Sequence, residues 1–265
     1  CILLDCGEGS YGQLVRSLGI EQADDALMRM KLVWISHMHA DHHLGLLQIL
    51  SRCKQLKRQS PLRVAGPKTL KLWLATYGKY CERIEFEFFD NASLVDPQQP
   101  HADYFPQHIG LRLQCVDVVH CPLSYGLVIE DCVQHWKLVY SGDTRPCSAL
   151  AEAGRDALVV IHEATFEDEL SKEAVYRLHC TTSEAMDVCV DQMNAYRTIL
   201  THFSQRYPRV PASMKDYPAV IKKGTVGLAF DLMAVNFCDL LDLPQIVKPL
   251  NRIFPHDLED DFVVD

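Results

Sequence analysis

Short apolar runs alternate along this chain with segments in which apolar residues recur every three or four positions. The run 31–35 has the length of a buried strand, and residues 1–7 have the pattern of the end of another. Helical spacing occurs at Leu44, Leu47 and Leu50, at Leu70 and Leu74, and across Thr182–Met193. The segment 90–110 contains three prolines and is loop-like. This alternation predicts a layered α/β architecture.

Polar residues that can bind metals stand at or just after the ends of five apolar runs. They are His37, His120, Asp143, Glu163 and His202. Strand ends can deliver side chains from distant parts of a chain to one rim of a rigid scaffold. We therefore expect these residues to converge on a single site.

The strongest local signal is the motif H-x-H-x-D-H at residues 37–42. Two imidazoles two positions apart, His37 and His39, can bind one cation, and Asp41 with His42 can bind a second. His43 falls outside this spacing and is interpreted as a neighbour. Two divalent cations about 3.5–4 Å apart are well suited to phosphodiester hydrolysis, because they stabilise both the attacking and the leaving oxygen.

A site for two cations needs about three protein ligands for each ion and a carboxylate that bridges them. The chain contains enough candidate ligands for such a site. The first ion is assigned to His37, His39 and His120, the second to Asp41, His42 and His202, and the bridge to Asp143. Imidazole and carboxylate ligands without thiolate favour zinc, with manganese possible. Cys121 is a tempting thiolate ligand, but a buried apolar role is favoured. Asp5 could orient a ligating histidine, or it could cap a glycine-rich turn.

Glu163 and His179 are a candidate acid–base pair that does not bind metal. A carboxylate stabilises a neighbouring imidazolium, which could then protonate a leaving alkoxide. Phosphodiester hydrolysis needs such an acid, because a ribose oxygen is a poor leaving group.

The composition describes an ordinary protein of 265 residues, of which 48% are hydrophobic and 23% charged. It fits one domain over 1–265 with an acidic tail at about 255–265, and no apolar run approaches the roughly 20 residues that cross a bilayer. Eleven cysteines without a C-x-x-C pair indicate free thiols in a reducing, intracellular compartment. The net charge is −9, yet residues 52–71 carry seven basic side chains and no acidic one. This basic stretch is either a solvated helix face or a footprint for RNA phosphates, with Arg52, Lys54, Lys57 and Arg58 as candidate contacts.

Taken together, the motifs resemble tRNase Z, a family of metallo-β-lactamase-fold endoribonucleases. The resemblance is carried by residues 37–42, His120, residues 141–146 (SGDTRP), residues 162–165 (HEAT) and residues 201–207 (THFSQRY). It implies a four-layer αβ/βα sandwich with two zinc ions, and removal of the 3′ trailer from precursor tRNA. The products would be a 3′-hydroxyl on the tRNA and a 5′-phosphate on the trailer. It further implies that Asp41 orients or deprotonates the attacking water and that His179 with Glu163 protonates the departing oxygen.

Two departures from the family pattern refine this interpretation. Cys180 stands where family members often have serine, and only residues 121–142 separate His120 from Asp143, too few for the tRNA-clamping arm of short forms. Because the sequence starts in mid-pattern, further amino-terminal strands are expected upstream. The chain is therefore similar to the carboxyl half of a eukaryotic long form, whose upstream half would carry the arm. Such a protein is expected in the nucleus, the mitochondrion or both. Arg145 and Arg206 could contact phosphate or form structural salt bridges.

Two other functions remain open at this point. One is a hydrolase of the same fold that acts on a small thioester or cyclic nucleotide. The other is an RNA-binding half that has lost catalysis, although such halves lose ligands and this chain keeps all seven candidates.

Overall fold

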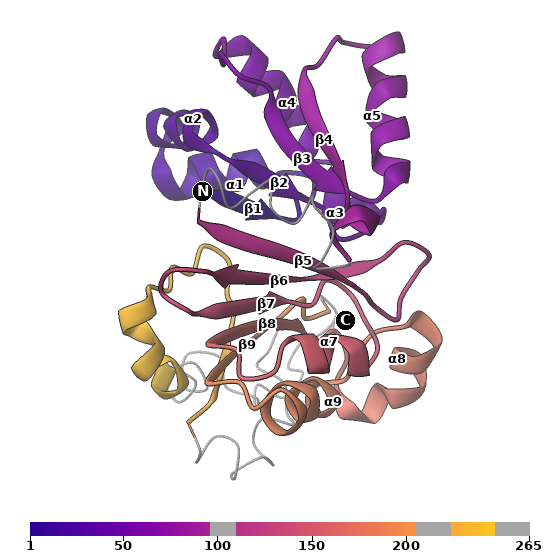
Figure 1. Cartoon of the computed structure of the whole chain (residues 1–265), viewed down its shortest axis with the longest axis vertical. Coiled ribbons are helices and arrows are strands. Elements are labelled where there is room, and N and C mark those ends of the chain that lie inside the picture. Colours follow the sequence, from indigo (N-terminus) through magenta and orange to yellow (C-terminus); the bar gives the residue numbers. More distant parts are fainter. Residues whose placement is uncertain (96–109, 205–223, 247–265) are drawn as a thin grey trace, which may run out of the picture. The chain divides into compact units, whose positions relative to one another are not determined.

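The computed structural model describes residues 1–95, 110–204 and 224–246 (Figure 1). The chain divides into two compact units, Cys1–His135 and Trp136–Asp265. A single domain over 1–265 stays a prediction. The expected acidic tail lies outside the described residues, as does most of the segment 90–110.

The first unit contains a parallel sheet whose strand order follows the chain order. Its strands are β1 (Ile2–Leu4), β2 (Leu32–Trp34), β3 (Leu62–Gly66) and β4 (Phe86–Asp90). The helices between them are α1 (Ser10–Leu18), α2 (Ile20–Arg29), α3 (Ala40–His43), α4 (Leu46–Gln55) and α5 (Lys68–Tyr80). After the short 3-10 turn η1 (Asn91–Leu94), β5 (Leu111–Asp117) and β6 (Tyr125–Asp131) pair antiparallel. Neighbouring parallel strands need a crossover connection, and the helices named above provide it between β1, β2, β3 and β4.

One hydrophobic cluster joins the sheet of the first unit to its helices. It includes Leu27 of α2, Val33 of β2, Leu50 of α4 and Leu74 of α5, each at most 2% exposed. The helices predicted from the spacing of Leu44–Leu50 and Leu70–Leu74 are therefore confirmed as α4 and α5. Helix α5 buries Leu70 and Leu74, as the spacing predicts. Helix α4 buries Leu46, Ile49 and Leu50 instead, because Leu44 precedes the helix and is 37% exposed.

The second unit also contains a parallel sheet, with β10, β9, β8 and β7 as consecutive neighbours. The strands are β7 (Lys137–Tyr140), β8 (Val159–Glu163), β9 (Arg197–Thr201) and β10 (Val226–Leu228). Its helices are α7 (Ser148–Ala153), α8 (Ser171–Arg177) and α9 (Thr182–Met186), with 3-10 turns η3 (Asp168–Leu170), η5 (Phe237–Leu241) and η6 (Leu243–Ile246).

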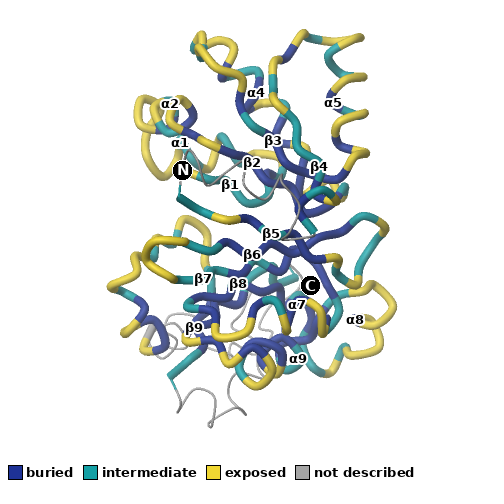
Figure 2. The backbone as a smooth tube through the Cα atoms, viewed as in Figure 1, coloured by how far each residue is buried: buried dark blue, intermediate teal, exposed yellow. Residues whose placement is uncertain are grey.

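Successive residues of β9 belong to different hydrophobic clusters on the two faces of this sheet. Leu200 packs with Met186 of α9, whereas Ile199 packs with Leu240 of η5 and Leu243 of η6. Successive side chains of a strand point to opposite faces of the sheet, so this alternation is expected for a strand that is covered on both sides. Figure 2 shows that β8 and β9 are mostly buried and that α8 is mostly exposed.

The helix predicted across Thr182–Met193 begins where expected but changes its winding. Thr181 and Glu184 form a reciprocal capping box at the start of α9. From Asp187 to Gln192 the chain continues as a π-helix, η4, which ends with the Met193 amide donating to the Val188 carbonyl at 2.9 Å. The apolar spacing identified the helical segment but could not distinguish the wider turn.

All eleven cysteines are free thiols, as the sequence predicts, and six of them are buried. Burial raises the pKa of both Cys6 and Cys115 to about 12. Within the described residues, no helix is long and apolar enough to cross a membrane.

Alkylation of the native protein at pH 8 is expected to separate these thiols into two classes. A pKa of about 12 leaves only about one thiolate in ten thousand at this pH, so Cys6 and Cys115 should react very slowly. The exposed Cys81, Cys132 and Cys238 should react within minutes. Peptide mass spectrometry after timed iodoacetamide treatment measures this, and full labelling in guanidinium is the control. Equal rates for Cys115 and Cys238 would contradict the described packing.

Candidate metal centre

In the first unit, the turn after β1 and the helix α3 are locked together by close backbone packing. The Cys6 amide donates to the His42 carbonyl at 2.7 Å, and the Gly45 amide donates to the Cys6 carbonyl at 2.9 Å. A Cβ on Gly7 would lie 2.2 Å from the Asp41 carbonyl oxygen, so this approach requires glycine. The turn that carries Asp5 is thereby fixed against the helix that carries Asp41 and His42.

Three imidazoles of the first unit converge on one point. His37 Nε2 lies 2.9 Å from His39 Nδ1, which lies 3.1 Å from His120 Nε2. The three rings meet edge to face, with centroids 4.6–4.9 Å apart. His37 is fully buried, and its Nδ1 lies 2.9 Å from the Ser36 hydroxyl. The loops after β2 and β5 thus bring together the three predicted ligands of the first ion.

This arrangement fits a divalent cation. Zinc–nitrogen bonds of about 2.0–2.1 Å place neighbouring ligand nitrogens roughly 3.3 Å apart in a tetrahedral site, close to the separations found here. A proton on His39 Nδ1 would form a hydrogen bond to only one of the two neighbouring nitrogens, His37 Nε2 or His120 Nε2. A cation would bind all three nitrogens at once. The donor set is the kind that zinc prefers.

Asp5 lies directly against His42. Its Oδ2 is 2.7 Å from His42 Nδ1 and accepts from the Ser36 hydroxyl at 2.8 Å, while Oδ1 accepts from the Ser36 amide at 2.7 Å. His42 Nε2 lies 3.6 Å from Asp41 Oδ2. Asp5 has a positive φ of 57°, an uncommon conformation for a residue with a side chain. These contacts orient His42 so that Nε2 is the nitrogen directed towards Asp41.

In the second unit, the carboxyl ends of β7, β8 and β9 carry the remaining candidates. Glu163 is the last residue of β8 and is in register with Thr201, next to His202. Asp143 follows β7 and is 3% exposed; its Oδ1 lies 3.5 Å from His202 Nε2, and its Oδ2 lies 4.0 Å from His179 Nδ1. His202 is held in the left-handed region, with φ 62°. Parallel register thus brings together residues that are 59 positions apart in sequence.

Glu163 is buried and accepts from five donors. Its Oε1 accepts hydrogen bonds from the Thr144 amide and from His179 Nδ1, both at 2.8 Å. Its Oε2 accepts hydrogen bonds from the amide and the hydroxyl of Thr165 and from the Cys180 amide. A carboxylate with only donors around it is the anionic partner that a protonated imidazole needs. The predicted Glu163–His179 pair is therefore in direct contact.

The departure at Cys180 has a structural counterpart. The thiol is buried and donates to the Thr144 carbonyl at 3.0 Å. Burial raises the pKa of this thiol well above its usual value, so it stays protonated and can donate. The thiol of Cys180 thus supports the loop at Thr144, whereas the backbone amide of Cys180 donates a hydrogen bond to Glu163.

The sequence left open whether Arg145 contacts phosphate or forms a structural salt bridge. In the structure it forms a salt bridge. It forms a two-pronged ion pair with Glu184, at 2.6 and 2.5 Å, and donates to the His179 carbonyl at 2.6 Å. The guanidinium thus ties the loop after β7 to the start of α9 and holds the backbone of His179. Sequence reasoning did not connect Glu184 with this site, although the S/T-x-x-E pattern of a capping box was visible.

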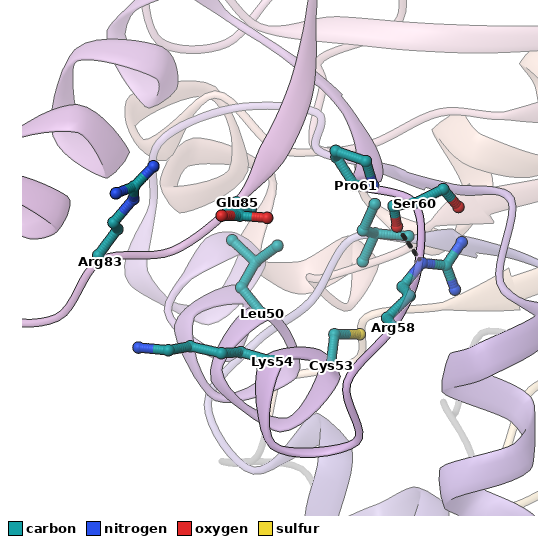
Figure 3. Close-up of a pocket in the computed structure, with 9 residues that line it drawn as sticks. Leu50, Cys53, Lys54, Arg58, Ser60, Pro61, Arg83 and Glu85 are labelled. Carbon is teal, nitrogen blue, oxygen red and sulfur yellow. Dashed lines mark hydrogen bonds between the residues drawn. The ribbon is translucent and has the colours of Figure 1, made fainter.

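The basic stretch is largely engaged in contacts within the first unit. Arg52 pairs with Asp24 at 2.5 Å, and Lys54 pairs with Glu82 at 3.0 Å. Arg58 donates to the carbonyls that end α2, at Leu27, Met28 and Met30, and to Ser60, as Figure 3 shows. These contacts stabilise helix ends and a loop. Lys57 is exposed.

Cys121 and His43 both lie beside imidazole ligands of the first unit. The expectation that Cys121 is a buried apolar residue is wrong: it is only half-buried, and its Sγ lies in a group with the ligand atoms of His37, His39 and His120. A loop residue beside a ligand does not have to enter the core. His43 donates through Nδ1 to the His39 carbonyl at 2.8 Å and packs on Trp73, as a neighbour would. Arg206 lies outside the described residues.

The β-lactamase superfamily domain model matches residues 1–203. The chain belongs to this family. It is 38% identical to the mitochondrial tRNase Z TRZ3 of Arabidopsis thaliana and 38% identical to the zinc phosphodiesterase ELAC protein 2 of Homo sapiens, over 98% of its own length in each case. It spans about a third of each of these relatives, 34% and 32%.

Solved structures agree with this assignment. The long-form RNase Z of yeast superposes with a TM-score of 0.82 at 26% identity, covering 96% of this chain and 39% of that one. The short-form human tRNase Z superposes with a TM-score of 0.69 at 23% identity, covering 89% and 88%, and supports the fold alone. The predicted metallo-β-lactamase fold and the resemblance to tRNase Z are confirmed.

Proposed function

We propose that the two groups of ligands combine into one dinuclear zinc centre. His37, His39 and His120 would hold one ion, Asp41, His42 and His202 the other, and Asp143 would bridge them. Support comes from the convergence of three imidazoles in one unit and from the approach of His202 to Asp143 in the other. Superfamily membership and the name zinc phosphodiesterase among the relatives agree with this assignment.

The proposed activity is endonucleolytic removal of the 3′ trailer from precursor tRNA. The observation that carries it is the Glu163–His179 contact of 2.8 Å in the same cluster as Asp143 and His202. Such a pair suits substrates whose leaving group is a poor one, such as a ribose oxygen. Relatives named tRNase Z supply the substrate class.

Each side chain then has a definite task in the reaction. When bound, the two cations would lower the pKa of water and neutralise charge on the phosphate. Asp41, whose Oδ2 lies 3.6 Å from His42 Nε2, would orient or deprotonate the attacking water. His179 engages Glu163 through Nδ1, so Nε2 is the atom that gives its proton to the departing 3′ oxygen. Asp5 holds the ring of His42 through its other nitrogen.

The contacts with the rest of the tRNA are proposed to be shared with other parts of the protein. Because Arg52, Lys54 and Arg58 have partners within the chain, Lys57 is the best placed of the four basic candidates to meet a phosphate. We further propose an upstream half of the same protein that carries the tRNA-clamping arm. The mitochondrion is the proposed compartment, as in the names of two plant relatives; a nuclear pool is a further proposal.

The test is cleavage of a 3′-extended precursor tRNA by the full-length protein loaded with zinc, compared with bis(4-nitrophenyl) phosphate. We expect a single cut after the discriminator nucleotide, with a 3′-hydroxyl on the tRNA and a 5′-phosphate on the trailer. Chelation by EDTA should abolish it, and zinc or manganese should restore it. Hydrolysis of the small diester without cleavage of the precursor would favour the small-substrate hydrolase instead. Retention of zinc without either activity would favour a non-catalytic RNA-binding role.

A further inference from the structure

We propose that Thr165 is a positioning residue that sets which nitrogen of His202 faces the metal centre and links this ring to the Glu163–His179 pair. This inference rests on the proposed function in so far as His202 is taken as a ligand. In the sequence Thr165 is only one member of a motif, and no chemical role follows from its position there.

One hydroxyl joins three side chains of the second unit. Thr165 Oγ1 lies 2.6 Å from Glu163 Oε2, 2.8 Å from His202 Nδ1 and 3.3 Å from His179 Nδ1. The rings of His179 and His202 are stacked, with centroids 5.6 Å apart and planes 23° apart. The hydroxyl therefore lies between the candidate proton donor and a candidate ligand.

The direction of each hydrogen bond follows from counting protons. A carboxylate only accepts, so the single proton of the Thr165 hydroxyl goes to Glu163 Oε2. The contact with His202 at 2.8 Å must then be a bond that Nδ1–H donates to Oγ1. A neutral imidazole carries one N–H, so His202 Nε2 keeps its lone pair. This is the atom that lies 3.5 Å from Asp143 Oδ1, on the side where the cation is proposed.

The backbone keeps this hydroxyl in place. The Thr165 amide donates to Glu163 Oε2 at 3.1 Å, and the Thr165 carbonyl accepts from the Ser204 amide at 3.2 Å. The β-branched side chain has few χ1 rotamers. Thr165 thus connects the end of β8 with the loop after β9 that carries His202.

Comparison of Thr165→Val with Thr165→Ser tests this role, because valine keeps the shape and loses the hydroxyl, whereas serine keeps the hydroxyl. We expect Thr165→Val to weaken cobalt or zinc binding by about 10–100-fold, the usual effect of removing a partner that orients a ligand. Thr165→Ser should stay within a few-fold of the unmodified protein. Competition with a chelating dye measures the affinity. An unchanged affinity in Thr165→Val would overturn the proposal.

A second measurement does not depend on any variant of Thr165. In the unmodified full-length protein, metal-free and labelled with 15N-histidine, the His202 signal should show the proton on Nδ1; the signal is assigned with His202→Asn. A neutral ring protonated on Nε2 would overturn the proposal.

The two proposals can fail separately. If the expected tautomer and affinities are found but precursor tRNA is not cleaved, the proposed function fails and the role of Thr165 stands. If precursor tRNA is cleaved but Thr165→Val binds metal with unchanged affinity, the proposed function stands and the role of Thr165 fails.

Discussion

Replacement of Asp143 by alanine is expected to abolish cleavage of precursor tRNA and to reduce the bound zinc. Its carboxylate is 3% exposed, lies 3.5 Å from His202 Nε2 and is proposed to bridge both cations. Removal of a shared ligand weakens both sites at once and leaves the repulsion between the two cations less compensated. Zinc content by plasma mass spectrometry and a cleavage assay measure the two effects.

Glu169→Ala is a matched control for this variant. Glu169 is an exposed acidic residue of η3 in the same unit, and its loss should change neither zinc content nor rate. Circular dichroism should show that Asp143→Ala keeps its helices and strands. Cleavage by Asp143→Ala near the unmodified rate would contradict the bridging role, whatever its zinc content.

Replacement of His179 by alanine is expected to keep both zinc ions and slow turnover by about 10²–10⁴, the usual contribution of a general acid. His179 Nδ1 lies 2.8 Å from Glu163, which directs Nε2 to the leaving oxygen. The leaving group distinguishes this role from a purely structural one. A substrate that releases 4-nitrophenolate hardly needs protonation, so His179→Ala should hydrolyse bis(4-nitrophenyl) phosphate at close to the unmodified rate.

The control for this variant is His135→Asn, because His135 is an exposed histidine whose positive φ of 59° asparagine tolerates. It should resemble the unmodified protein with both substrates. Loss of zinc in His179→Ala would show that His179 is a ligand. An equal slowing with both substrates would instead assign to it a role in shaping the site.

The positions of several strands and helices along the chain followed from the local pattern of apolar and polar residues. The apolar run before His37 became β2, and the apolar spacing at Leu70 and Leu74 became α5. These assignments depend on which residues enter a core, and that is visible in the order of apolar and polar positions. The π-helix after Met186 was not foreseen, because its apolar spacing differs little from that of an α-helix.

The basic stretch shows where sequence reasoning reached its limit. A run of seven positive charges without a negative one left a solvated helix face and phosphate contacts both open. In the structure, Arg52 and Lys54 pair with Asp24 and Glu82, each 28 positions away. Charge along a sequence counts only near neighbours, whereas an ion pair depends on which helices pack together.

The sequence by itself determined the chemistry of the candidate site: the motif at 37–42, the carboxylate and histidines at later strand ends, and hence a preference for zinc. Only the tertiary structure decided how these groups are supported, by Asp5 behind His42, by Arg145 behind His179 and by the hydroxyl of Thr165. The physical reason is the distance along the chain over which each feature is decided. The type of a ligand is a property of one residue, but the hydrogen bond of 2.7 Å between Asp5 and His42 requires two distant segments to be brought together by the sheet.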